Sequence, residues 1–89
     1  MKLDYTIQVW KEGQQFVAHA MPLDVMSAGP TPAEARTALY EAVDLFLATA
    51  TEMDTLDEIL EESGYALNQG EWFSPVWVAM EQHSTLVEA

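Results

Sequence analysis

Four acidic side chains form the densest charged group in the sequence: Asp57, Glu58, Glu61 and Glu62, which lie within two turns of one predicted helix. Carboxylates at this spacing can attract a basic protein and raise the rate at which it binds. They can equally form a solvated helix face, since negative charge near a helix N-terminus is stabilising. The four residues are therefore candidate partner-binding residues, with a solvated face as the alternative.

Groups suited to catalysis or metal binding are sparse. The chain has no cysteine, which excludes disulfides, zinc–thiolate sites and a cysteine nucleophile. His19 and His83 lack a metal-ligand spacing. A ribonuclease-H-type reaction needs carboxylates that converge on divalent metals, but the apolar pattern of the first predicted helix turns Glu41 and Asp44 away from Asp4. We expect no catalytic residue, no metal and no cofactor, and hence no enzyme.

Three tryptophans are candidates for protein contacts, because tryptophan is enriched at interface hot spots. Trp10 lies on the opposite face of a predicted strand from Tyr5 and Ile7, so either a second layer covers it or it is exposed to a partner. Trp72 and Trp77 lie near a predicted edge strand, and edge strands can pair between subunits. Trp10 is therefore a candidate partner-binding residue, with burial in the core as the alternative that is more common in a small domain. Trp72 and Trp77 are candidates for an oligomer edge, and a homo-oligomer is favoured over a monomer.

The net charge argues against one class of partner. The chain carries 15 Asp and Glu residues against 3 Lys and Arg residues, a formal net charge of −12. Proteins bind nucleic acid by neutralising phosphates with many basic side chains, so we expect no direct binding to DNA or RNA. A strongly acidic surface repels anionic membranes and steers basic proteins towards it. Alternatively, it only keeps a small protein soluble.

Length and hydropathy predict one folded domain over residues 1–89. A hydrophobic content of 49% with 20% charged residues is typical of a packed globule and not of a disordered acidic tail. The first residues lack the apolar run of a signal peptide, and no apolar stretch approaches the roughly 18 residues of a membrane span. We expect a cytoplasmic protein that does not bind membranes.

Alternation of apolar and polar residues predicts three antiparallel strands at the start of the chain. Residues 3–11 show the period of two, residues 15–21 form the returning strand of a hairpin, and residues 25–29 form a short third strand. A helix follows at residue 31 or 32 and extends to about Met53. Its start is predicted by the capping-box spacing of Thr31 and Glu34 and by Pro32 at the first helical position. Its apolar stripe comprises Ala35, Ala38, Leu39, Ala42, Val43, Phe46 and Leu47.

The second half of the chain contains a shorter helix and two more predicted strands. Thr55 and Glu58 repeat the capping-box spacing, and Gly64 is suited to end the helix. Residues 66–71 are predicted to be a loop. The remainder is predicted to form two strands, one on each side of a turn at Gln82 to Ser84. The order β-β-β-α-α-β-β predicts an α+β domain with an antiparallel sheet.

Residues 5–52 resemble the HicB-like antitoxin domain. The shared pattern is a strand that begins near a tyrosine, a Glu-Gly turn, a second strand that runs to a proline, and Gly-x-Thr-x-x-Glu-Ala before an apolar helix. In this chain the matching residues are Tyr5, Glu12-Gly13, Phe16-Val17-Ala18, Pro22, Gly29, Thr31, Glu34-Ala35, Glu41-Ala42 and Leu45. The resemblance implies a compact sheet-plus-helix fold, described as partial ribonuclease-H-like.

The resemblance also implies a function. Typical HicB antitoxins bind and occlude a small, basic toxin that cleaves mRNA, and many carry a separate C-terminal DNA-binding domain. No helix-turn-helix pattern or basic segment follows Gly64. We therefore expect a stand-alone HicB-like antitoxin whose partner is a HicA-like toxin. The alternative is an orphan, self-assembling structural or regulatory domain of the same fold with no toxin partner.

Overall fold

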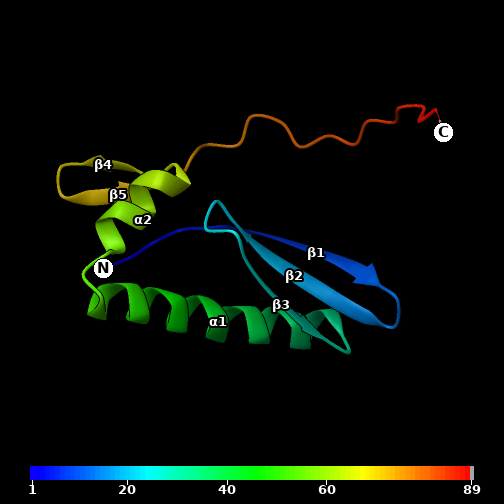
Figure 1. The fold of residues 1–89 in the computed structure, drawn as a ribbon, viewed down its shortest axis with the longest axis horizontal. Coiled ribbons are helices and arrows are strands. Elements are labelled where there is room, and N and C mark those ends of the chain that lie inside the picture. Colours follow the sequence, from blue (N-terminus) through cyan, green and yellow to red (C-terminus); the bar gives the residue numbers. More distant parts are fainter. Residues whose placement is uncertain (89) are drawn as a thin grey trace.

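The computed structural model describes residues 1–88 and has a mixed α+β fold (Figure 1). Three antiparallel strands form a sheet in the order β1-β2-β3, and a separate hairpin forms a two-stranded sheet. The predicted α+β class and the general order of elements are confirmed, although the last two strands lie at other residues than predicted. The elements are β1 (Thr6–Glu12), β2 (Gln15–Met21), β3 (Val25–Gly29), α1 (Pro32–Glu52), α2 (Leu56–Ser63), β4 (Ala66–Asn68) and β5 (Glu71–Phe73). Neither helix within residues 1–88 is long and apolar enough to cross a membrane.

The core lies between one face of the three-stranded sheet and α1. Ala18 and Ala20 of β2 are fully buried, and their small side chains let the helix approach the sheet closely. From α1, Leu39 and Val43 fill this interface. All seven residues of the predicted apolar stripe are buried or half-buried, which confirms the prediction. The other face of the sheet carries Trp10 and has no helix packed on it (Figure 1).

The start of α1 follows the predicted capping pattern. Thr31 is the N-cap residue, and its hydroxyl accepts a hydrogen bond of 3.1 Å from the backbone N–H of Glu34. Pro32 occupies the first turn, where its missing N–H costs nothing. Gly29, at the end of β3, brings the sheet against this turn: a Cβ built on it would lie 2.8 Å from the backbone nitrogen of Ala35. The helix therefore begins where strand and helix backbones touch.

The ends of α2 differ from each other in how well the sequence predicts them. Gly64 ends the helix in a left-handed conformation with φ 102°, as its position predicts. Thr55 is the N-cap residue, as its position predicts, but the capping-box hydrogen bond expected from its spacing with Glu58 is absent. Thr55 makes no side-chain cap hydrogen bond, and its hydroxyl instead donates to the backbone carbonyl of Ala50, 3.4 Å away.

The hairpin β4–β5 replaces a predicted loop. Gln69 and Gly70 both have positive φ, which is the requirement of the two-residue turn that suits the twist of a hairpin. Leu67 pairs with Trp72 across the two strands. The two strands predicted around Gln82 to Ser84 are wrong, because residues 74–88 contain neither helix nor strand. A strand needs a neighbouring strand for its backbone hydrogen bonds, and within residues 1–88 no strand pairs with that segment.

Tyr65 ties the second half of the chain to the first. Its side chain is buried, and its hydroxyl donates a 2.6 Å hydrogen bond to the backbone carbonyl of Asp4. Burial, with smaller contributions from Asp4 and Tyr5, raises the pKa of this hydroxyl from 10.0 to about 12. The folded chain therefore holds the phenolic proton more tightly than the unfolded chain does. This contribution to stability is complete below a pH of about 10 and is lost as the pH rises towards 12.

Replacing Tyr65 with phenylalanine is expected to lower the free energy of unfolding near neutral pH by about 1 kcal/mol, because the carbonyl of Asp4 loses its donor. The variant should also lose less stability than the wild type at alkaline pH, since the titrating hydroxyl is gone. Urea unfolding from neutral to alkaline pH measures both effects. Tyr40→Phe removes a hydroxyl from an exposed residue of α1 and is the control. An equal alkaline decline in wild type and Tyr65→Phe would contradict the prediction.

Candidate functional site

The acidic face of α2 is an outward-facing surface of the molecule. Leu56, Ile59 and Leu60 form the apolar stripe of this short helix and turn towards the body, as the sequence predicts. The four predicted partner-binding carboxylates therefore face outward. All of them are exposed: Asp57, Glu58, Glu61 and Glu62.

The negative charge of this face is not neutralised by any ion pair within residues 1–88. Among residues 1–88 the one ion pair within 4.0 Å joins His19 to Asp24. Lys2, Lys11 and Arg36 are exposed and form no ion pair with any carboxylate of that range. Exposed charges of one sign with no cation beside them attract a basic molecule over about one Debye length. The α2 face is therefore free to pair with a partner's cations.

An apolar groove of about 350 Å³ lies beside the acidic face, at the junction of α1 and α2. Met53, which caps the end of α1, is 67% exposed at this groove. Ile59 contributes from α2, and Glu62 follows it by three residues on the same side of the helix. We call the acidic face and this groove together the α2 surface. The groove is lined by Phe46, Thr49, Ala50, Met53, Thr55 and Ile59.

Trp10 belongs to a different surface. It lies on the face of the sheet opposite α1 and is 38% exposed. Its indole N–H donates to a carboxylate oxygen of Glu12, 3.3 Å away, and its ring meets the ring of His19 edge-on with centroids 6.3 Å apart. Near the β1–β2 turn, Trp10 is at the other end of the sheet from α2 (Figure 1). The structure therefore does not bring Trp10 together with the four carboxylates.

The two tryptophans expected at an oligomer edge have different surroundings. Trp72, in β5, is half-buried and packs against the core cluster. Trp77 lies in the segment 74–88, and its indole N–H donates to the hydroxyl of Thr6 at the start of β1, 2.7 Å away. Trp77 is thus placed at an edge of the three-stranded sheet, whereas Trp72 is part of the packing that holds the hairpin.

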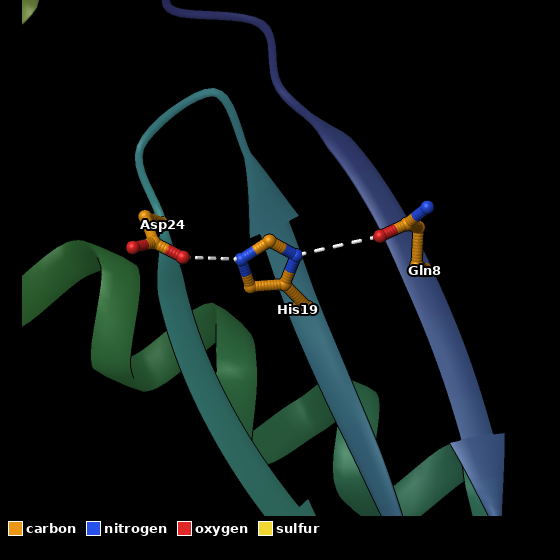
Figure 2. A network of polar contacts seen from close by, with 3 residues as sticks. All are labelled: Gln8, His19 and Asp24. Carbon is orange, nitrogen blue, oxygen red and sulfur yellow. Dashed lines mark hydrogen bonds and ion pairs between the residues drawn. The ribbon is translucent and has the colours of Figure 1, made fainter. Parts of the chain in front are cut away.

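His19 is the centre of a small polar network on the open face of the sheet, shown in Figure 2. Its Nε2 lies 2.7 Å from a carboxylate oxygen of Asp24, and its Nδ1 lies 3.4 Å from the side-chain oxygen of Gln8. An ionised carboxylate only accepts, so Nε2 carries a proton. Both ring nitrogens thus lie within 3.4 Å of a polar side-chain atom. The arrangement is a structural network.

The carboxylates considered for metal-dependent chemistry do not form a metal site. Asp4, Glu41 and Asp44 are all exposed. Residues 1–88 contain no group of three or more His, Asp or Glu side chains arranged to hold a metal ion. His83 lies in the exposed segment 74–88 and not in the turn expected there.

The α2 surface is the arrangement most suited to binding a macromolecule, because it combines free charge with an adjacent apolar groove. The sequence indicates the carboxylates but not the groove, whose lining comes from two helices. No family model, curated protein or solved structure matches this chain.

Proposed function

We propose that this chain is a HicB-like antitoxin-type protein that acts in the cytoplasm and occludes a small basic, mRNA-cleaving toxin. The observation that carries the proposal is the set of four exposed carboxylates on α2, which have no cationic partner within residues 1–88. The order of strands and helices is consistent with the HicB-like, partial ribonuclease-H-like fold that the sequence resembles.

The α2 surface offers two features that favour such binding: negative charge, which speeds association, and an apolar groove, which slows dissociation. A net charge of −12 accelerates encounter with a basic protein, because the attraction acts over about one Debye length, roughly 8 Å at physiological salt. Carboxylates then accept paired hydrogen bonds from arginine side chains. The apolar groove receives a hydrophobic side chain of the partner, and this contact slows dissociation because breaking it returns apolar surface to water.

Neutralising the α2 face is expected to slow binding of the basic partner. The variant Asp57→Asn, Glu58→Gln, Glu61→Gln and Glu62→Gln should lower the association rate constant about tenfold at about 50 mM NaCl, with a smaller effect on dissociation. The probe is the short basic protein encoded by an open reading frame beside the gene for this chain, co-expressed with it. Stopped-flow mixing of the purified partners measures the rate.

A control with the same net charge separates the α2 face from the overall charge. Converting four of the exposed carboxylates outside the α2 face to glutamine gives a matched variant: Glu41, Glu71, Glu81 and Glu88. This control should bind nearly as fast as the wild type. Equal slowing in both variants would show that only the total charge affects the association rate. An association rate that does not change with salt would show that charge does not steer the partner.

A self-assembling domain of the same fold without a toxin is the alternative function. It predicts that no short basic protein is encoded beside the gene and that none co-purifies with the chain. Its structural support comes from the exposed segment 74–88 and not from the α2 surface.

A further inference from the structure

The segment 74–88 is exposed from Val76 onward and contains the apolar run Val76 to Met80. It contains no helix, strand or turn, and no backbone–backbone hydrogen bond involves any of its residues. Val76 is 89% exposed, Val78 96% and Leu86 96%. Figure 1 shows the segment leaving the body of the molecule and ending well beyond it. Within one copy, this apolar surface is left in water.

The molecule exposes more surface to solvent than a compact folded chain of its mass. Its accessible surface is 6832 Å², whereas a compact folded chain of 9.9 kDa has about 5,200 Å². The radius of gyration is 15.4 Å, against about 12 Å for a compact domain of this length. The excess of about 1,600 Å² per chain is about twice the 800 Å² that each partner buries in a standard interface. It is therefore large enough for a stable, intertwined dimer.

The outer edge of β1 is free to accept a strand. β1 pairs with β2 on one side and is the first strand of the sheet, so its other side has no strand beside it within residues 1–88. A seven-residue edge with open N–H and C=O groups is a template for another chain. The edge also lies next to the segment, because Trp77 donates to the hydroxyl of Thr6 at its start.

We propose that residues 76–80 of one copy add as a strand to the outer edge of β1 in a second copy, with the exchange made in both directions. The sequence Val76-Trp77-Val78-Ala79-Met80 is uncharged, rich in β-branched and aromatic residues, and bounded by Pro75 and Glu81. Reciprocal exchange closes the assembly at two copies, since each copy gives one segment and accepts one at its β1 edge. The proposal does not depend on a basic partner.

Salt distinguishes this dimer from binding to a basic protein. Each copy carries a net charge of −12, so the two copies repel each other at long range. The exchanged strand itself carries no charge, and residues 72–80 contain no ionisable side chain. Screening by salt should therefore strengthen the dimer, whereas the same salt weakens binding to a basic partner. Failure of one proposal leaves the other measurable.

The test uses the full chain and two proline variants. Val78→Pro removes a strand N–H from the centre of the exchanged segment and is expected to raise the dimer dissociation constant about tenfold or more. Val78 has no backbone hydrogen bond within one copy, so the monomer should fold normally. Val87→Pro changes a similarly exposed valine outside the strand and is the control. Sedimentation velocity at about 50 and about 500 mM NaCl measures the mass.

Three results decide the proposal. A dimer that tightens with salt, weakens in Val78→Pro and persists in Val87→Pro supports it. A wild-type monomer at every concentration overturns it, as does a dimer that Val78→Pro leaves unchanged. Hydrogen exchange at the amides of residues 76–80 separates exchange between copies from pairing within one copy. Protection that rises with protein concentration is the expected result, and protection independent of concentration would show that each segment pairs with its own sheet.

Discussion

Replacing Gly29 with alanine is expected to lower the free energy of unfolding by about 2–3 kcal/mol. The added Cβ would lie 2.8 Å from the backbone nitrogen of Ala35 and 2.9 Å from the carbonyl carbon of Glu34. Both atoms belong to the first turn of α1, whose position is held by the hydrogen bond between Glu34 and Thr31. The clash is with backbone, so no side-chain rotation relieves it, and the helix must move away from the sheet.

The sign of this effect is informative. Where a glycine has room for a Cβ, alanine stabilises a protein by about 0.4–1 kcal/mol, because it restricts the unfolded chain. Urea unfolding of Gly29→Ala therefore separates the two cases. Ala28→Gly, at the exposed neighbouring position of β3, is the control and should cost only about 0.5–1 kcal/mol. A more stable Gly29→Ala variant would show that β3 and α1 are not in close contact.

Replacing Leu60 with alanine is expected to cost about 3 kcal/mol and to loosen α2 before the rest of the fold. Leu60 is fully buried and is the one buried residue of this eight-residue helix. A helix this short is not stable alone in water, so its attachment to the core decides whether it forms. Loss of the Leu60 side chain should therefore detach α2 from the core, disrupt the α2 surface and weaken binding of a basic partner as well.

Hydrogen exchange and urea unfolding together test this prediction. Amides of α2 should lose protection in Leu60→Ala, while those of β2 and α1 keep most of theirs. Leu45→Ala is the matched control, since this leucine of α1 is 69% exposed and its truncation should change the free energy of unfolding by less than about 0.5 kcal/mol. A uniform loss of protection over the whole chain in Leu60→Ala would contradict an independently loosened α2.

The first half of the fold was predictable because its signals are local. The period-two pattern of residues 3–11 matches β1, although the strand begins later, at Thr6. Thr31, Pro32 and the apolar stripe predict α1 correctly to within a residue at each end. Each of these features depends on residues no more than a few positions apart, so each can be predicted from the sequence without the tertiary fold.

The second half was predicted less well because strands depend on partners. Residues 66–71 contain turn residues, and the sequence does not show that Leu67 and Trp72 pair across the turn. Val76-Trp77-Val78 has the composition of a strand but pairs with no strand within residues 1–88, and it is exposed. Strand propensity measures how well a residue packs in a sheet and not an independent preference of its backbone. A segment with high strand propensity therefore forms a strand only where a sheet is present to pair with it.

The sequence by itself determined the helices, the first three strands, the net charge and the outward direction of the α2 carboxylates, since these follow from spacing along the chain. Only the tertiary structure decided that Trp10 lies away from those carboxylates, that a groove opens beside Met53, and that the edge of β1 is free. Each of these joins residues from separate elements. Spacing along the chain sets the face on which a residue lies, but packing between elements sets what that face meets.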